Sequence, residues 1–274
     1  MAFITGASSG IGMLTAVSLA AAGCKVIATM RNLEKQSALL ELAEQRGVAN
    51  QITCMALDVT NEQQAAQVVQ TVINAEGRID LLVNNAGFAV GGYVEEVPME
   101  AWRSQLETNF FGVVALTRAV IPHMRKQMSG RIINVSSLSG RFGFPGYAPY
   151  AASKFAVEGL SEALRHELLP FGIQVVLVEP GAFKTSIWQK GFEQIHTTEH
   201  SPYRKGMEAV LRYSRSAAEN APDPQLVANL VVRIANERAP KLRYPIGNGA
   251  RSALLGKALL PWKWFERIAQ RAMR

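Results

Sequence analysis

The sequence is poor in the residues that bind metals or form disulfides. Its 274 residues include two cysteines, Cys24 and Cys54, which form no CxxC motif and sit at the edges of apolar segments. Cysteines in that setting are usually buried or inert thiols. The four histidines do not have the spacing of metal ligands; they are His123, His166, His196 and His200. We therefore predict no metal site.

Long hydrophobic runs are also missing. A glycine, proline or charged residue interrupts each apolar stretch well before roughly 18 residues, so no transmembrane helix is predicted. No signal peptide is visible, because Phe3 and Ile4 already have the pattern of a strand that leads into Thr5 and Gly6. We therefore expect a cytoplasmic protein. Because a first strand normally has more residues before its turn, we also expect a natural start a few residues upstream.

The excess of positive charge is confined to one end of the chain. The net charge is +7 at pH 7, and residues 239–274 alone hold eight Lys/Arg and one Glu. The rest of the chain is balanced in charge, whereas a nucleic-acid-binding surface needs a basic patch or stripe on the domain itself. We expect no nucleic-acid partner.

Short runs of β-branched and aliphatic residues alternate with longer helical patterns. The predicted strands are Ala2–Thr5, Lys25–Met30, Ile52–Leu57, Asp80–Asn84, Arg131–Ser136, Ile173–Glu179 and Leu242–Ile246. The predicted helices include Ile11–Ala22, Asn61–Glu76, Pro98–Gln127 and Tyr150–Leu169. Strands that are apolar on both faces and separated by helices are typical of βαβ units in a parallel sheet. We therefore interpret residues 1–274 as one α/β domain, since no linker or repeat divides them.

Residues 180–224 depart from this alternation. They are rich in glycine, aromatic and polar residues, and an insertion of that size inside a compact domain is usually functional. We predict a substrate lid over about residues 182–222, followed at the end of the chain by a basic helical tail over about residues 251–274.

The first strand leads directly into Thr5–Gly12, which reads TGASSGIG and precedes a helix. Glycines let the backbone turn sharply and approach a pyrophosphate, and a helix N-terminus offers free N–H groups. The spacing is GxxxGxG, and the lysine of a triphosphate-binding P-loop is absent. The turn predicts a dinucleotide site, with tight strand–helix packing as the alternative. The expected contacts are Gly6, Ser8, Ser9, Gly10, Ile11 and Gly12.

The end of the second strand distinguishes the two nicotinamide cofactors. A carboxylate there binds the ribose 2′-hydroxyl of NAD, whereas a cation accommodates the 2′-phosphate of NADP. The strand ends in Arg31 and Asn32 without a carboxylate, and a guanidinium suits a bidentate phosphate contact. We predict that NADP(H) is preferred over NAD(H); the alternative is an exposed arginine at a helix start.

Tyr150 and Lys154 are spaced to lie one turn apart on the same face of a helix. A neighbouring ammonium, helped by the positive nicotinamide of an oxidised cofactor, favours the phenolate and makes a tyrosine a usable proton carrier. The fifth strand ends in Ser136 and Ser137, at the carboxyl edge of the sheet where ligands bind in doubly wound folds. Together these residues predict an acid–base site.

Taken in order, these motifs resemble those of the short-chain dehydrogenases/reductases along nearly the whole chain. The matching positions are Thr5–Gly12, Asp58–Val59, Asn84–Gly87, Asn109 with Gly112, Ser137, Tyr150 with Lys154, and Pro180–Gly181 with Thr185. The resemblance implies a Rossmann-type, doubly wound, seven-stranded parallel sheet flanked by helices. It also implies an NAD(P)-dependent enzyme that acts on CH–OH donors, assembled as a homodimer or homotetramer through the helices around residues 98–127 and 150–169.

The resemblance also implies roles for four catalytic residues. Ser137 polarises the substrate oxygen while Tyr150 gives or takes its proton. Lys154 holds the nicotinamide ribose, and Asn109 bends its helix around a water that links Lys154 to solvent. The spacing to the tyrosine selects Ser137 over Ser136. A strand-end turn for the serines and a helix cap for Asn109 are the alternatives.

For the cofactor, the resemblance implies that Asp58 meets the adenine amino group beside the Val59 backbone. A helix cap is the alternative for Asp58. The remaining implied contacts are Asn85, Ala86, Gly87, Pro180, Gly181 and Thr185, besides Tyr150 and Lys154.

Aromatic and aliphatic residues gather near the predicted cleft, in Phe142–Tyr147 and Phe183–Ile195; they are Phe142, Phe144, Tyr147, Phe183, Ile187, Trp188 and Phe192. An apolar pocket suits a hydrophobic carbonyl or alcohol, and Tyr150–Gly191 resembles the steroid and retinoid dehydrogenase branch. Two alternatives stay open. One is a 3-oxoacyl thioester reductase whose basic tail meets the carrier. The other is a non-catalytic NADP(H)-binding sensor or scaffold, which has no need for the intact catalytic set.

The tail from Pro261 to Arg274 has an amphipathic pattern. Its apolar helical face comprises Trp262, Phe265, Ile268 and Ala272, and its polar face Lys263, Arg267, Gln270 and Arg274. A basic helix with tryptophans can make weak contact with an anionic membrane surface, which makes the protein peripheral. A helix that packs on the sheet edge or on another subunit is the alternative that we favour.

Overall fold

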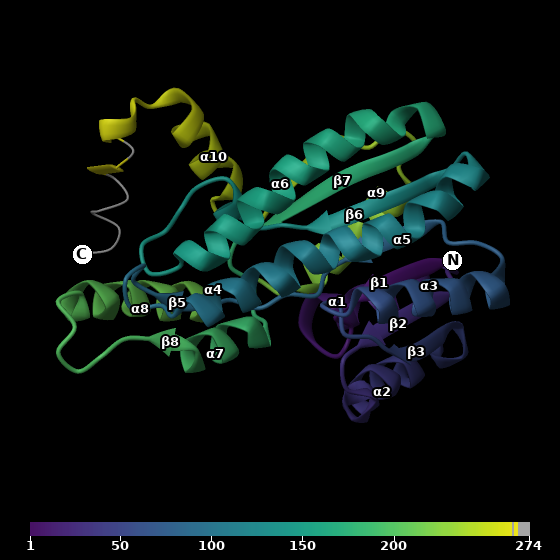
Figure 1. Cartoon of the computed structure of the whole chain (residues 1–274), viewed down its shortest axis with the longest axis horizontal. Helices are drawn as coiled ribbons and strands as arrows, with labels where there is room; N and C mark the ends of the chain where they lie inside the picture. Colours follow the sequence, from purple (N-terminus) through teal and green to yellow (C-terminus); the bar gives the residue numbers. More distant parts are fainter. Residues whose placement is uncertain (265, 268–274) are drawn as a thin grey trace.

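A seven-stranded, all-parallel sheet forms the centre of the computed structural model, which describes residues 1–264, 266 and 267 (Figure 1). The strand order is β3-β2-β1-β4-β6-β7-β9. The bounds are β1 Ala2–Thr5, β2 Val26–Met30, β3 Ile52–Ala56, β4 Leu81–Asn84, β6 Gly130–Val135, β7 Ile173–Pro180 and β9 Arg243–Ile246. All seven predicted strands are confirmed, with no end shifted by more than one residue. The order reverses between β1 and β4, and ligands bind beyond the carboxyl ends of strands at such a point.

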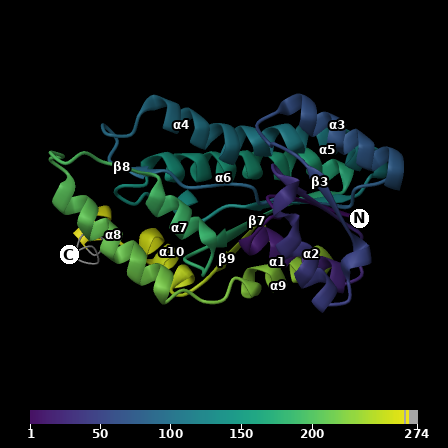
Figure 2. The same ribbon diagram turned by 90° about the horizontal axis from the view of Figure 1, so that it is seen from below.

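Helices cover both faces of the sheet (Figure 2). One layer contains α1 Gly10–Ala21, α2 Ser37–Gln45 and α9 Gln225–Asn236; the other contains α3 Glu62–Glu76, α5 Gly112–Gln127 and α6 Ala148–Leu168. A hydrophobic core lies on each face of the sheet, and successive residues of β1 belong to different cores. Phe3 packs with the α3–α5–α6 layer, whereas Ile4 packs with the α1–α9 layer. This two-sided burial explains why the strands are apolar at successive positions.

The predicted helix Pro98–Gln127 is three elements in the structure. They are α4 Met99–Leu106, the π-helical turn η3 Glu107–Phe111, and α5. The buried Asn109 lies in the π-turn and uses its side chain to bond the backbone of Phe88. A π-turn widens a helix locally and often marks a functional site. The short 3₁₀ elements are η1 Leu33–Gln36, η2 Ala49–Gln51, η4 Leu138–Gly140 and η5 Leu169–Phe171.

The predicted lid region is mostly helical. It contains α7 Ser186–Glu193, β8 Ile195–His196 and α8 Arg204–Glu219. The sequence analysis did not foresee that β8 pairs in parallel with β5 Gly91–Gly92 to form a second, small sheet. Tyr93 and Tyr203 stack beside it, with ring centroids 4.4 Å apart, so the lid is fastened to the body of the domain.

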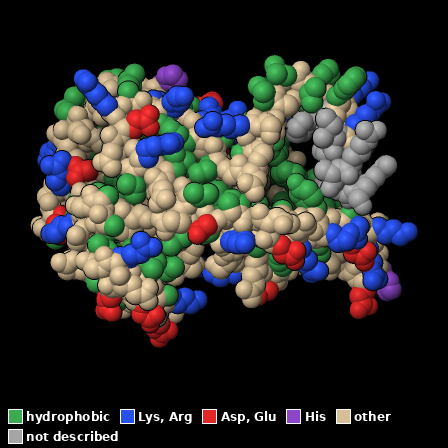
Figure 3. All heavy atoms as spheres, turned by 180° about the vertical axis from the view of Figure 1, so that it is seen from behind, with side chains coloured by type: hydrophobic (Ala, Val, Ile, Leu, Met, Phe, Trp, Pro, Cys, Tyr) green, Lys and Arg blue, Asp and Glu red, His purple; other side chains and the backbone are tan. Residues whose placement is uncertain are grey.

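The C-terminal region begins with α10 Ala250–Leu259. In the predicted amphipathic tail, Phe265 and residues 268–274 lie outside the described part of the chain. Trp262 and Trp264 are exposed, at 64% and 62%. Leu255 and Leu259 of the preceding helix are also exposed, at 60% and 73%. The described part of this tail therefore does not pack on the sheet edge, and its packing on another subunit stays a prediction. Figure 3 shows hydrophobic side chains gathered with basic ones on this lobe, at the top right. In the described part of the chain, no helix is both long and apolar enough to cross a membrane.

Candidate active site

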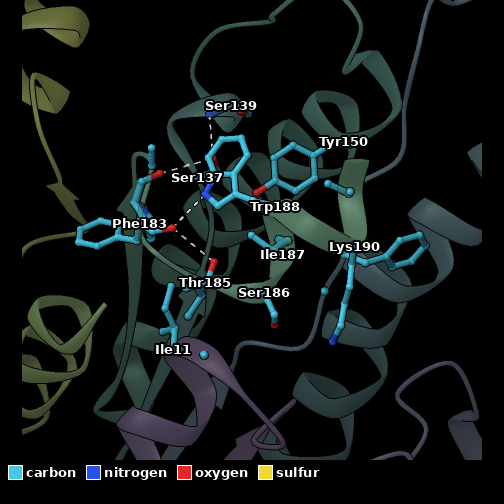
Figure 4. A pocket seen from close by; sticks show the side chains of 18 of the residues that line it. Ile11, Ser137, Ser139, Tyr150, Phe183, Thr185, Ser186, Ile187, Trp188 and Lys190 are labelled. Carbon is cyan, nitrogen blue, oxygen red and sulfur yellow. Dashed lines mark hydrogen bonds between the residues drawn. The ribbon is translucent and has the colours of Figure 1, made fainter. Parts of the chain in front are cut away.

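A pocket of about 1120 Å³ lies at the carboxyl ends of the central strands (Figure 4). Its wall joins the glycine-rich turn, the predicted catalytic residues and the lid. It includes all predicted cofactor contacts except Asp58, and all predicted catalytic residues except Asn109. In the described residues no cluster of side chains has the composition of a metal site.

The glycine-rich turn has both of the roles weighed from the sequence. Gly12 is demanded by packing, since an added Cβ would lie 2.4 Å from Asn85 Nδ2 and 2.4 Å from the carbonyl oxygen of Gly6. Gly6 adopts φ +68°, and a Cβ added there would lie 2.7 Å from the Cα of Ala86. Thr5 Oγ1 fastens this contact by accepting hydrogen bonds from the backbone N–H groups of Asn85 and Ala86, both at 3.0 Å.

The same turn leaves a helix N-terminus facing the pocket. Helix α1 begins at Gly10, and its N-cap residue Ser9 makes no side-chain capping bond. The first turn of α1 contains no acidic residue, and Ser9, Gly10 and Ile11 line the pocket. Free N–H groups and a positive dipole end suit a pyrophosphate, so this turn fits a dinucleotide.

Two basic residues lie beyond the carboxyl end of β2. Arg31 is exposed and lines the pocket, and so does Lys35 of η1. The sequence analysis missed Lys35; its position four residues after Arg31, in a short helical turn, was the available signal. Asn32 begins that turn by accepting a hydrogen bond from the N–H of Glu34 at 2.8 Å. This end of the pocket therefore presents two cations.

The Asp58 carboxylate uses one of its two oxygens to hold the turn that follows it, and its contact with the adenine stays a prediction. Its Oδ1 accepts hydrogen bonds from the N–H and hydroxyl of Thr60, at 3.0 and 2.8 Å. The cap of α3 is Asn61, which accepts from Gln64 N at 2.9 Å, so the helix-cap alternative for Asp58 is wrong. Asp58 stabilises the turn that brings Val59 to the pocket wall.

Asn109 connects three segments from below the pocket. Its Oδ1 accepts from Phe88 N at 3.1 Å, while its Nδ2 donates to Phe88 O at 3.0 Å and to Ser153 Oγ at 3.1 Å. Because Asn109 lies within the π-turn, the helix-cap alternative is wrong for it as well. Its amide positions the Asn85–Phe88 loop and the helix that carries Tyr150.

Tyr150, Lys154 and Ser137 converge on the pocket. The two helical residues follow one turn apart on α6, and Lys154 is only 6% exposed. Its Nζ donates to the carbonyl of Val135 at 2.8 Å and lies 5.8 Å from the centre of the Tyr150 ring. Ser137 Oγ accepts from Ser139 N at 3.1 Å. Ser136 is 3% exposed, whereas Ser137 is partly exposed, which agrees with the choice of Ser137.

Burial shifts the pKa values of Tyr150 and Lys154 in opposite directions. It raises the pKa of Tyr150, although the Ser137 hydroxyl acts in the opposite direction. It lowers the pKa of Lys154 to about 8, with the charge of Glu158 opposing the decrease. The sequence analysis expected the Lys154 ammonium to favour the Tyr150 phenolate. In the protein without cofactor, burial outweighs that effect, because removing water penalises both charged forms. Tyr150 is a phenol here, which is a proton donor.

The side of the pocket at which the sequence predicts the substrate is apolar. Of the seven residues named from the sequence, Phe192 is the exception, since it packs on Trp188 with ring centroids 6.1 Å apart and does not line the pocket. Trp188 Nε1 donates to the carbonyl of Phe183 at 2.9 Å, which fixes the indole as a wall (Figure 4). The lid and tail contribute further lining residues that the sequence analysis missed, namely Val210, Tyr213, Ala217 and Ala253.

Comparison with known proteins agrees with this geometry. A family model described as short chain dehydrogenase matches residues 1–196. The chain belongs to the short-chain dehydrogenases. It is 47% identical to "Uncharacterized oxidoreductase YusZ" of Bacillus subtilis, over 100% of this chain and 98% of the relative. As an oxidoreductase of this family, it has the Rossmann-type sheet that the resemblance implied.

Other short-chain dehydrogenases match with more specific names. The chain is 37% identical to a 3-ketodihydrosphingosine reductase of Bacteroides thetaiotaomicron, covering 89% of this chain and 86% of the relative. It is 38% identical to retinol dehydrogenase 8 of Bos taurus, covering 88% and 79%. The relatives therefore include enzymes named for lipophilic small molecules.

Solved structures of the family contain both nicotinamide cofactors. A metagenomic short-chain oxidoreductase in complex with NADP matches with a TM-score of 0.72 and 28% identity, covering 90% of this chain and 96% of that one. A short-chain dehydrogenase/reductase of Burkholderia phymatum in complex with NAD matches with a TM-score of 0.80 and 27% identity, covering 97% and 93%. The fold thus binds nicotinamide cofactors of either kind.

Proposed function

We propose that the protein interconverts a carbonyl and a primary or secondary alcohol on a hydrophobic small molecule, with NADP(H) as cofactor and Tyr150 as acid–base residue. The observation that carries the proposal is the single pocket. It joins an anion-binding helix end, a buried Tyr150–Lys154 pair and an aromatic wall. A structural role alone does not account for a buried lysine beside a tyrosine at the carboxyl edge of the sheet.

The cofactor would be held along the whole carboxyl edge. The N-terminus of α1 would bind the pyrophosphate, Arg31 and Lys35 the 2′-phosphate, and Lys154 the nicotinamide ribose. Asn85–Gly87 and Pro180–Gly181 with Thr185 would line the nicotinamide end. Bound there, the nicotinamide supplies or accepts the hydride. The absence of a carboxylate at the end of β2 supports the preference for NADP(H).

The residues of the chain move the proton and stabilise the oxygen. In the reductive direction the raised pKa of Tyr150 suits a phenol that protonates the substrate oxygen. Ser137 donates a hydrogen bond to the same oxygen as negative charge develops on it. The Lys154 ammonium stabilises the phenolate that remains. Oxidation is the reverse of these steps.

The aromatic wall supports a lipophilic substrate. Phe142 and Phe183 are buried, at 6% and 2% exposure, and Tyr147 and Trp188 complete the wall. Among the relatives named above, one is a sphingosine-precursor reductase and another a retinol dehydrogenase. Such molecules carry their polar group at one end of a long apolar body, which matches a pocket with catalytic groups at one end.

Two other functions have different requirements. A 3-oxoacyl thioester reductase needs a basic rim for the carrier or nucleotide part, and Arg251 and Lys257 of α10 offer one near the pocket residue Ala253. A non-catalytic NADP(H) sensor needs the cofactor end of the pocket alone. The convergence of Ser137, Tyr150 and Lys154 favours an enzyme.

One assay separates the three functions. NADPH consumption, with NADH in parallel, is measured against aromatic ketones, retinals, ketosteroids, long-chain 3-keto amphiphiles, aliphatic aldehydes and oxoacyl thioesters. We expect NADPH-dependent turnover of the apolar carbonyls. Turnover confined to thioesters supports the second function, and tight NADPH binding without turnover supports the sensor.

The remaining partners are also proposals. Exposed Phe111 (50%) and Phe155 (45%) on the helical layer that contains α5 and α6 support a homodimer or homotetramer. The exposed tryptophans of the tail, with Lys263 and Arg267 between and after them, support weak contact with an anionic membrane. Liposome co-sedimentation with and without residues 261–274 tests the second proposal; binding that survives the deletion contradicts it.

A further inference from the structure

Two carboxylates are buried close together, one on the catalytic helix α6 and the other on β7. Glu158 follows Lys154 by one turn of α6 and is 5% exposed. Glu179, near the end of β7, is 0% exposed. A carboxylate without water needs a cation and hydrogen bonds to remain ionised. The sequence motifs gave neither residue a role.

Arg243 of β9 supplies the charge that these carboxylates need. Its Nε donates to Glu158 Oε2 at 2.9 Å and lies 3.2 Å from Glu179 Oε1. A second guanidinium, from Arg141, donates to the same Glu179 oxygen at 2.9 Å. Two buried carboxylates are thus held between two arginines, and these ion pairs connect α6, β7, β9 and the end of η4.

The charged layer formed by Glu158, Glu179, Arg141 and Arg243 lies next to the catalytic residues. Arg141 directly follows η4, which begins beyond Ser137, and Glu179 directly precedes Pro180. Gly140 shows how tightly η4 lies on α6, since a Cβ there would be 3.0 Å from Glu158 Cγ and 3.0 Å from the carbonyl oxygen of Lys154. A change of charge in this layer therefore reaches the site with little solvent between.

Lys154 has no counter-ion of its own among the described residues. The hydrogen-bond partner of its Nζ is the neutral carbonyl of Val135, and the described ion pairs do not include it. Glu158 is the charged group whose field favours the Lys154 ammonium, against the burial that lowers its pKa to about 8. Burial and the charge of Glu179 raise the pKa of Glu158 itself, and the Ser136 hydroxyl and Arg243 oppose that increase.

We propose that Glu158, kept ionised by Arg243, is a positioning residue that keeps the buried Lys154 ammonium charged and so sets the upper pH limit of the site. The proposal rests on the proposed function for its catalytic consequence but not for its effect on cofactor binding. The titratable and charged groups that face this pair come from α6, β7, β9 and the end of η4; they are Tyr150, Glu162, Glu179, Arg243 and Arg141.

The test compares Glu158→Gln with a matched control on the same helix. Glu162 accepts a hydrogen bond from the same Arg243 at 2.5 Å, but it is 55% exposed. NADPH affinity by cofactor fluorescence, and kcat/KM for reduction, are measured from pH 6 to pH 10 in the full-length protein. In Glu158→Gln we expect the basic limb of both profiles to move to lower pH by about one unit, because an opposite charge has been removed from a buried lysine. Glu162→Gln should superimpose on the unchanged protein, and Glu158→Asp should restore the original limb.

A basic limb that stays in place in folded Glu158→Gln overturns the proposal, as does an equal shift in Glu162→Gln. If Glu158→Gln does not fold, Glu158→Met removes the same charge without burying an amide and should show the same acid shift; an unshifted limb again overturns the proposal. If the unchanged protein binds NADPH but turns nothing over, the proposed function fails while the binding profile alone still decides the role of Glu158.

Discussion

Gly12→Ala is the substitution whose effect can be worked out most directly from the structure. The new Cβ would lie 2.4 Å from Asn85 Nδ2 and 2.4 Å from the backbone oxygen of Gly6, well inside van der Waals contact. The carbonyl cannot rotate away, because the turn around Gly6 is bonded to the Asn85–Ala86 segment. Overpacking of this kind costs about 1–3 kcal/mol. The better helix propensity of alanine recovers about 1 kcal/mol at most.

The clash also moves the segment that lines the cofactor end of the pocket. We therefore expect NADPH affinity to fall by about tenfold or more, since about 1.4 kcal/mol corresponds to a factor of ten. Urea unfolding measures the stability, and a fluorescence titration measures the affinity. Gly256→Ala is the matched control, since Gly256 lies within α10 and the nearest atom to an added Cβ is Leu260 Cδ1 at 3.9 Å. It should stabilise the protein by about 0.5–1 kcal/mol and leave NADPH binding unchanged. Wild-type affinity and stability in Gly12→Ala would refute the packing argument.

Three further predictions concern the chemistry. Tyr150→Phe should abolish turnover and leave the dissociation constant for NADPH within about twofold; residual turnover above one per cent, measured from NADPH absorbance, would argue for another proton donor. Arg31→Ala should weaken NADPH binding by about tenfold or more and leave NADH binding unchanged, because a charge-assisted phosphate contact contributes about 1.5–3 kcal/mol; equal losses for both cofactors would remove Arg31 from the phosphate site. The rate of reduction should fall as pH rises through about 8, because burial lowers the pKa of Lys154 to that value and the ammonium is lost above it; a plateau to pH 10 would contradict that assignment.

The sheet and most of the site could be predicted from the sequence because both depend on local signals. Strands buried on two faces have continuous apolar runs, and the glycine turn, Tyr150 and Lys154 lie at fixed spacings along the chain. The site residues then meet because parallel strands all end at one edge.

Features that depend on distant pairs were not predictable in this way. Arg243 and Glu158 are 85 residues apart in sequence, and nothing local indicates that their side chains meet. The strands β5 and β8 join the body of the domain to the predicted lid region. Each strand has two residues, which is too short for a sequence pattern to predict it. Asn109 lies in the π-turn and bonds Phe88 and Ser153, which lie in other segments of the chain.

Asp58 and the pKa of Tyr150 show a second limit. The spacing of Asp58 from the strand predicts a ligand contact, but it does not show that one oxygen of the carboxylate also holds Thr60. For Tyr150, the neighbouring ammonium was visible in sequence, whereas the desolvation that outweighs it is set by the folded surroundings. A sequence gives the identity of interacting groups more readily than their solvent exposure.

The central claim, hydride transfer to a hydrophobic carbonyl with Tyr150 as proton donor, is tested most directly by isotope transfer. The protein is incubated with an apolar ketone or aldehyde that it reduces and with NADPH carrying deuterium at either of the two C4 positions, and the alcohol is analysed by mass spectrometry. We predict one deuterium in the product from one of the two labelled cofactors and none from the other, with no product in Tyr150→Phe. Product without deuterium from either cofactor, or an undiminished yield in Tyr150→Phe, would contradict the account.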